Sequence, residues 1–304
     1  MKHINYTDEL LSKVFFKLIE LAATRLPIDI QLELENIYKQ ETDSLAKLQL
    51  ETILENLEIA RKEKKPICQD TGIISFQILY GKNGPKLDIF RIKDILINIV
   101  KKATNEIPLR PNAVELFKGN TGNNIGKYIP WFYYEFIENR DYHEIIAFLK
   151  GGGCSNVSAL KMLNPGVGIK GIINEIIDST IKAGGKGCPP YIIGIGIGGG
   201  EDIAMILAKK ALMIPCNEYN KEPEIAELEI KLKNAINDLG IGIMGLGSGK
   251  TVIDLHILNA ARHPASLPLA ISFNCWALRY SIVKLYNDKI IYPSHKEEYI
   301  VEGL

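Results

Sequence analysis

The first 65 residues carry apolar side chains at the three- and four-residue spacing of amphipathic helices. Two stripes have this spacing: Leu10, Leu11, Val14, Leu18 and Leu21, and then Leu45, Leu48, Ile53, Leu54 and Leu57. The charged residues between them are of both signs and well mixed, which is typical of solvated helix faces. The pattern predicts an all-helical N-terminal segment, residues 1–65, that holds no catalytic groups.

From Pro66 onward the pattern changes to turn residues and short apolar runs. Residues 75–80 and 87–90 flank the turn Gly81-Lys-Asn-Gly, which predicts a hairpin. Further helices are expected at about 91–106, 168–182, 201–212 and 222–239, and further strands at 131–138, 144–149, 191–195, 252–258, 267–273 and 282–292. The elements are mixed without strict alternation, and no repeat or Pro/Ser-rich linker interrupts them. We predict a mixed α/β fold in a single domain, 1–304, with a helical N-terminal layer and a mixed-sheet body, 66–304.

The composition is that of an ordinary globular protein. The chain has 304 residues, of which 46% are hydrophobic and 24% charged. Thirty-six Lys and Arg residues balance 36 Asp and Glu residues, so no overall field attracts a nucleic acid. No run approaches the roughly 20 apolar residues of a membrane span, and the start lacks the apolar core of a signal peptide. We therefore expect a cytoplasmic protein without nucleic-acid or membrane partners.

The segment Gly194–Gly199 fits the dinucleotide fingerprint G-x-G-x-x-G, follows a strand-like run and precedes a helix. The stretch after that helix, Met213–Glu218, is a poor second strand to present an acid to a ribose. A dinucleotide-dependent oxidoreductase using the Gly194–Gly199 loop is therefore the alternative function. Close backbone packing, or an anion site lined by backbone, would explain the same glycines.

A second glycine run, Gly245–Thr251, resembles a phosphate-binding loop. The motif G-x-x-x-x-G-K-[ST] requires glycine at position 244, where this chain has Met244. The run also leads into a strand-like segment, whereas a phosphate site needs a helix N-terminus behind it. An NTPase is therefore disfavoured.

The chain has five cysteines and no Cys-x-x-Cys pair, which argues against a disulfide framework. Cys68, Cys154, Cys188 and Cys216 lie among turn residues, and Cys275 ends an apolar strand. Glycine and proline can fix a backbone so that distant thiolates converge on a metal. Each cysteine taken alone could equally be a small buried apolar residue.

Four motifs together resemble one family. They are Cys68-Gln-Asp-Thr-Gly, Lys150-Gly-Gly-Gly-Cys-Ser-Asn-Val-Ser, Cys188-Pro-Pro-Tyr, and Arg262-His-Pro-Ala-Ser-Leu-Pro leading to Cys275. In this order they resemble the α subunit of the iron–sulfur hydro-lyases, the class I fumarate hydratases and L(+)-tartrate dehydratases. The resemblance covers nearly the whole chain and implies a [4Fe-4S] cluster held by Cys68, Cys188 and Cys275. With three thiolate ligands, one iron is open and can polarise the hydroxyl of a 2-hydroxy acid.

The resemblance also implies the groups that act beside the cluster. Asp70 and His263 match catalytic residues that handle the leaving hydroxyl, although an aspartate before Thr71-Gly72 could simply cap a turn. The implied substrate-binding groups are Gln69, Arg110, Gly151 and Gly152. Arg110, between Pro108 and Pro111, is suited to bidentate pairing with a carboxylate, the alternative being an ordinary surface arginine.

The resemblance implies a heteromeric enzyme. Longer members carry a second domain with further cationic residues and the base that takes the carbon-bound proton, whereas this chain stops at Leu304. A separate β subunit is expected, with a homodimer of α chains inside a heterotetramer, and the isolated α chain should be nearly inactive. Residues 153–154, 261–264 and 275–279 favour L-tartrate as substrate, and residues 158–163 favour L-malate or fumarate. A catalytically silent iron–sulfur subunit is a further alternative.

Overall fold

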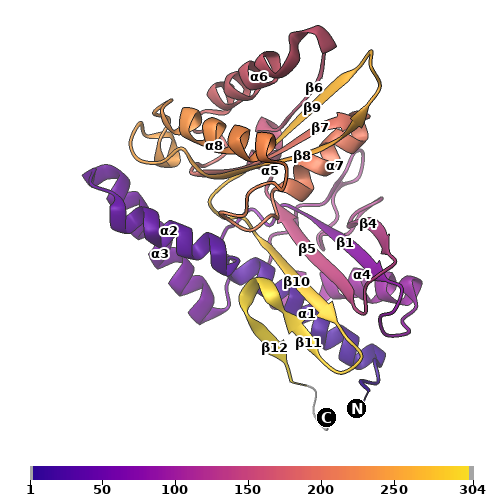
Figure 1. Ribbon diagram of the computed structural model, residues 1–304. Helices are drawn as coiled ribbons and strands as arrows, with labels where there is room; N and C mark the ends of the chain where they lie inside the picture. The colour runs from indigo at the N-terminus through magenta and orange to yellow at the C-terminus, as the bar shows by residue number, and fades with distance from the viewer. Residues whose placement is uncertain (1–2, 301–304) are drawn as a thin grey trace. The chain divides into compact units, whose positions relative to one another are not determined.

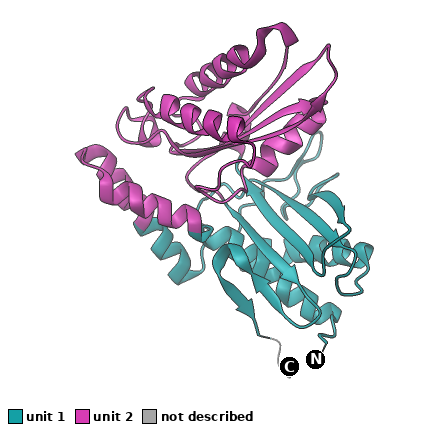
Figure 2. Cartoon of the chain, viewed as in Figure 1, with its two compact units in different colours: residues 1–28, 55–151, 279–304 teal, residues 29–54, 152–278 magenta. Residues whose placement is uncertain are grey.

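The computed structural model describes residues 3–300 and divides the chain into two compact units (Figure 2). Unit 1 contains the chain up to Ile28, Glu55–Gly151, and the chain from Arg279 onward. Unit 2 contains Asp29–Leu54 and Gly152–Leu278. The predicted mixed α/β class is confirmed, because N-terminal helices precede a body of mixed sheets. The organisation of residues 1–304 as one domain stays a prediction.

The N-terminal segment is helical, as its periodicity predicts. The helices are α1 (Asp8–Thr24), α2 (Ile28–Gln40) and α3 (Ser44–Glu63). Helix α1 begins after Thr7, whose Oγ1 accepts a hydrogen bond from the Leu10 N–H and so caps the first turn. Four residues of its predicted stripe are completely buried and Leu10 is half-buried; the four are Leu11, Val14, Leu18 and Leu21. In the second predicted stripe, on α3, Leu45 and Leu48 are exposed instead. Among residues 3–300, no helix is long and apolar enough to cross a membrane.

Unit 1 is built on a six-stranded sheet of order β12-β11-β10-β5-β1-β4 (Figure 1). Its strands are β1 (Ile73–Gly81), β4 (Trp131–Ile137), β5 (His143–Lys150), β10 (Tyr280–Leu285), β11 (Ile290–Tyr292) and β12 (Glu297–Tyr299). Strand β4 runs parallel to β1, and the other neighbours are antiparallel. Helices α1 and α4 (Ile89–Glu106) pack side by side and share one apolar core with this sheet.

The predicted hairpin after Gly81 is wrong. The turn itself forms, with the Gly84 N–H donating to the Gly81 carbonyl at 3.2 Å. Residues 87–90 then enter α4, where the Asp88 side chain accepts the Phe90 N–H at 2.8 Å and caps the helix. A small hairpin forms further on, from β2 (Val114–Glu115) and β3 (Gly119–Asn120). The predicted strand 282–292 is in fact two strands, β10 and β11.

Unit 2 is built on a four-stranded sheet of order β6-β9-β7-β8. Its strands are β6 (Ala159–Leu163), β7 (Tyr191–Gly199), β8 (Val252–Arg262) and β9 (Leu267–Asn274), and its helices after α2 are α5 (Gly152–Val157), α6 (Gly168–Ala183), α7 (Glu201–Ala211) and α8 (Pro223–Asn237). Short 3-10 turns occupy Pro165–Val167 and Ile243–Gly245 here and Pro293–His295 in unit 1. Helices α6 and α8 share one apolar core with strands β7, β8 and β9. In this unit, helix α5 and strand β6 have no counterpart among the predicted helices and strands.

The glycines of the dinucleotide-like motif lie inside strand β7 rather than in a loop. A Cβ atom at Gly194 would lie 2.0 Å from the Ala208 carbonyl oxygen, and one at Gly196 would lie 1.9 Å from the Ala204 oxygen. Glycine is therefore required so that α7 can pack directly on β7. The first turn of α7 also carries Glu201 and Asp202, which would repel a phosphate. The alternative of a dinucleotide-dependent oxidoreductase using this segment as a loop is therefore wrong.

We expect Gly196→Ala to lower the free energy of unfolding by at least about 2 kcal/mol, because the clashing atom is backbone and cannot rotate away. Urea unfolding followed by circular dichroism measures this. The matched control is Gly153→Ala in helix α5, where an added Cβ would meet no atom closer than 3.7 Å. If both variants unfold at the wild-type urea concentration, the packing explanation is wrong.

Acid should weaken unit 1 through buried histidines. Burial lowers the pKa of His295 to about 4, and burial also lowers the pKa of His143. Since the folded-state pKa lies below the unfolded value, the unfolded chain binds the proton first as the pH falls. The contribution of these neutral histidines to the free energy of unfolding is therefore fully present near pH 7 and is lost between about pH 6.5 and 4. For His295 this contribution is roughly 3 kcal/mol.

We expect His295→Gln to flatten this loss of stability, measured as the urea midpoint between pH 7 and pH 4.5. The exposed His3 provides the control, and His3→Gln should keep the wild-type pH dependence. If the urea midpoint of His295→Gln falls with pH as steeply as that of wild type, His295 is not the source of the acid sensitivity.

Candidate active site

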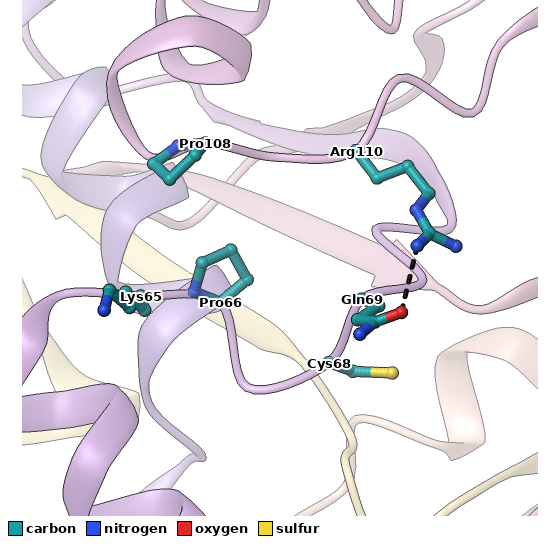
Figure 3. Close-up of a pocket in the computed structure, with 6 residues that line it drawn as sticks. All are labelled: Lys65, Pro66, Cys68, Gln69, Pro108 and Arg110. Atoms are coloured by element: carbon teal, nitrogen blue, oxygen red, sulfur yellow. Dashed lines mark hydrogen bonds between the residues drawn. The ribbon is translucent and has the colours of Figure 1, made fainter.

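The loop between α3 and β1 carries Cys68, Gln69 and Asp70 on the surface of unit 1. Its backbone is anchored on both sides of Ile67, whose N–H donates to the Ala23 carbonyl at 2.9 Å and whose carbonyl accepts from Asn56 Nδ2 at 3.0 Å. The loop opens into a pocket of about 470 Å³ (Figure 3), which is the size of a small-molecule site. The pocket is lined by Lys65, Pro66, Cys68, Gln69, Pro108 and Arg110.

Arg110 faces Gln69 across this pocket. Its Nη2 donates to Gln69 Oε1 at 2.9 Å (Figure 3). The Arg110 backbone is held from behind by Asn124, a buried residue whose Nδ2 donates to the Arg110 carbonyl at 3.2 Å. The Arg110 guanidinium suits a ligand that carries a carboxylate, whereas the Lys65 ammonium at the same pocket is ion-paired with Glu63.

Asp70 is held by its Oδ1 atom. This oxygen accepts from the Gly72 N–H and from Asn112 Nδ2, both at 2.8 Å. The first bond is the turn cap that the sequence allows, and the second fixes the carboxylate against the loop that follows Arg110. The turn-capping and catalytic interpretations of Asp70 are therefore compatible, because capping uses only one of the two oxygens.

The other oxygen, Asp70 Oδ2, faces Gly151. A Cβ atom at Gly151 would lie 3.0 Å from Oδ2 and 3.5 Å from Arg279 Nη2, so glycine lets the carboxylate and the guanidinium approach the same point. Arg279 is only 2% exposed, and its Nε makes no hydrogen bond within the part of the chain that the structure describes. Sequence analysis assigns Arg279 no role of its own, because nothing in the neighbouring residues reveals that it is buried beside Asp70.

In unit 2, Cys188 and Cys275 lie at one end of the sheet. Cys188 precedes β7 and Cys275 follows the antiparallel β9, where Ile192 pairs with Asn274. Burial above all, and also the nearby thiols of Cys154, Cys188 and Cys275, raise the pKa of the Tyr191 hydroxyl to about 12. Gly152, the remaining predicted binding residue, begins α5 in the same unit.

His263 lies at the opposite end of that sheet. It occupies the turn between β8 and β9, where Gly199 pairs with Arg262, and the eight residues of β9 span about 26 Å toward Cys275. Its Nδ1 accepts the Ala265 N–H at 3.1 Å, so the neutral ring carries its proton on Nε2. The structure therefore does not bring His263 to Cys275 within one chain.

The glycine run after α8 supports the Cys188 loop. The Met244 N–H donates to the Pro189 carbonyl at 2.7 Å, and a Cβ atom at Gly245 would lie 2.5 Å from the Gly185 Cα. The run then enters strand β8, as expected, rather than a helix. Its glycines thus allow close contact between two loops.

The three predicted cluster ligands are divided between the units. Cys68 belongs to unit 1, and Cys188 and Cys275 belong to unit 2. Within residues 3–300, no group of three or more His, Cys, Asp or Glu side chains could hold a metal ion. The thiol chemistry and the shared sheet end of Cys188 and Cys275 fit two ligands of an iron–sulfur cluster. The complete set of three stays a prediction.

Comparison with known proteins identifies the family. The family model described as "Fumarate hydratase (Fumerase)" matches residues 12–284. A protein of Methanocaldococcus jannaschii named "Putative L(+)-tartrate dehydratase subunit alpha" is 45% identical over 280 residues, covering 91% of this chain and 98% of the relative. The protein named "L(+)-tartrate dehydratase subunit alpha" from Escherichia coli K12 is 34% identical over 279 residues, covering 91% of each. The chain belongs to the fumarate hydratase (Fumerase) family, a family of hydro-lyases.

Proposed function

We propose that this chain is the α subunit of a [4Fe-4S]-dependent hydro-lyase that reversibly removes water from a 2-hydroxy dicarboxylate. The observation that carries the proposal is the pocket in which Cys68, Gln69 and Arg110 meet, with Asp70 on the same loop. A thiol, an amide, and cationic side chains at one opening are the donor set that a metal-assisted dehydration of a diacid needs.

The residues of the pocket have different roles in the proposed reaction. Arg110 binds a substrate carboxylate, and Gln69 orients the Arg110 guanidinium through their hydrogen bond. Asp70 Oδ2, the oxygen facing Gly151, gives a proton to the departing hydroxyl and takes it back in the reverse reaction. A cluster held by Cys68, Cys188 and Cys275 would supply a Lewis acid for that hydroxyl when bound.

L-Tartrate is the substrate that we favour, because both relatives are named for it. Loss of water from L-tartrate gives the enol of oxaloacetate, and loss of water from L-malate gives fumarate. The relatives' names also specify a subunit alpha, which supports a β subunit that completes the site with the base for the carbon-bound proton. We place the assembled enzyme in the cytoplasm.

The test is anaerobic reconstitution. The α chain purified alone and the α chain co-purified with the proposed β subunit are assayed for dehydration of L-tartrate and L-malate. We expect turnover only from the pair, with a higher kcat/KM for L-tartrate. Full activity of the α chain alone would refute the two-subunit proposal, and preference for L-malate would refute the choice of substrate.

We also infer that His263 acts in a second copy of the chain, within the predicted homodimer of α subunits. It lies exposed in the connection between β8 and β9, the two strands that flank β7, at the end of the sheet away from Cys188 and Cys275. A catalytic group in this position can only reach a cluster-bound substrate that belongs to another chain. Because Nε2 carries the proton of the neutral ring, His263 would present an N–H donor to that site.

A further inference from the structure

Cys154, which the ligand prediction omits, contacts the two loops of unit 2 that carry the predicted ligands Cys188 and Cys275. It lies in helix α5 and is 4% exposed. Its Sγ donates to the carbonyl of Gly187, the residue before Cys188, at 3.5 Å, and accepts the backbone N–H of Cys275 at 3.2 Å. A thiol has one hydrogen to donate, and here that hydrogen bonds to the loop before Cys188. The sulfur lone pair accepts the hydrogen bond from the loop that carries Cys275.

The backbone of Cys154 is fixed in turn. Ser158 Oγ donates to the Cys154 carbonyl at 2.8 Å and accepts the Phe273 N–H at 3.2 Å, which attaches the end of α5 to strand β9. The thiol therefore projects from an anchored helix and not from a mobile loop.

Tyr191 holds the Cys188 loop by a different route. Its hydroxyl donates to the Gly184 carbonyl at 2.7 Å and accepts the Gly187 N–H at 3.0 Å. These two bonds fix the shape of the turn before Cys188. They do not join that turn to Cys275, whereas the thiol of Cys154 does.

We propose that Cys154 is a positioning residue that sets the spacing between the thiols of Cys188 and Cys275. The consequence for a cluster rests on the proposed function, whereas the coupling of the two loops does not. Removing a group that hydrogen-bonds to the metal ligands, rather than to the metal, typically lowers metal affinity by about 10- to 100-fold.

The first test needs no cluster. The full-length chain is stripped of metal with a chelator, and the rates at which iodoacetamide alkylates Cys188 and Cys275 are measured by mass spectrometry. We expect both rates to rise about fivefold in Cys154→Ala, the factor expected when one hydrogen bond is lost. Cys154→Ser keeps a donor and an acceptor on a shorter bond and should give intermediate rates. If Cys154→Ala does not fold, the alkylation rates of Cys188 and Cys275 in Cys154→Ser alone test the proposal, and they should exceed the wild-type rates.

The matched control is Cys216→Ala. Cys216 is another cysteine of unit 2 and lies next to Asp29 and Asp254. Burial raises the pKa of its thiol. The substitution Cys216→Ala should leave the alkylation rates of Cys188 and Cys275 at their wild-type values. Equal rates in wild type, Cys154→Ala and Cys154→Ser would overturn the proposal.

The second test uses the α chain with its β partner under anaerobic conditions. We expect Cys154→Ala to acquire iron and sulfide but to lose iron to a chelator about 10- to 100-fold faster than wild type. If Cys154→Ala takes up no iron while its alkylation rates stay normal, Cys154 is a ligand and the positioning role is wrong. If wild type takes up no iron but the alkylation rates change as expected, the loop coupling stands and the proposed cluster function fails.

Discussion

Asp70→Asn should lower kcat of the reconstituted α–β enzyme by about a thousandfold, within the range that general acid–base groups contribute. The amide oxygen can still accept from the Gly72 N–H and Asn112 Nδ2, so the loop should keep its shape. What is lost is the ability of Oδ2 to carry a proton beside Gly151. The measurement is steady-state dehydration of L-tartrate, with iron content determined on the same sample.

The control for Asp70→Asn is Asp94→Asn, which removes an exposed carboxylate on α4 of the same unit. It should retain wild-type kcat. Iron content should be unchanged in both variants, which separates a lost proton carrier from a lost cluster. If Asp70→Asn keeps more than about a tenth of wild-type kcat, Asp70 is only a turn cap.

Paired chains with different defects should recover activity that each lacks alone. We expect Asp70→Asn and His263→Asn enzymes to be nearly inactive separately. In a dimer that contains one of each, one site combines the intact Asp70 of one chain with the intact His263 of the other. Two affinity tags isolate such mixed dimers, and about half of the wild-type specific activity is expected from one working site of two.

A site built within one chain gives the opposite result. Each chain of the mixed dimer would then carry one defect, and the activity would stay at the level of the separate variants. A mixed dimer of Asp70→Asn with wild type serves as the control and should show about half of the wild-type activity in either arrangement.

Much of the fold could be predicted from periodicity, because long amphipathic helices such as α1 and α4 bury a regular stripe. The error at residues 87–90 arose because four residues are too few to separate the periods of helix and strand. The decisive signal was Asp88, a helix cap followed by apolar residues at helical spacing. For Gly194 and Gly196 the sequence left close backbone packing, an anion site and a dinucleotide loop open, because the same glycine pattern fits all three, and the structure shows close packing against α7.

The site was only partly predictable. The grouping of Gln69, Asp70 and Arg110 follows from motifs that the structure brings to one face of unit 1. The spacing of 12 residues between His263 and Cys275 suggests proximity, but most of it is an extended strand that separates them. Arg279 and Cys154 were missed because their roles depend on burial and on contacts between loops far apart in sequence.

The central proposal is that Cys68, Cys188 and Cys275 hold one cluster. It is tested most directly by the iron and sulfide content of Cys68→Ala, Cys188→Ala and Cys275→Ala, each co-purified anaerobically with the β chain, with Cys216→Ala as control. We predict about four irons per α chain in wild type and in the control, and a loss of most iron in each of the other three. Full iron content in Cys68→Ala, the only one of the three in unit 1, would contradict the account.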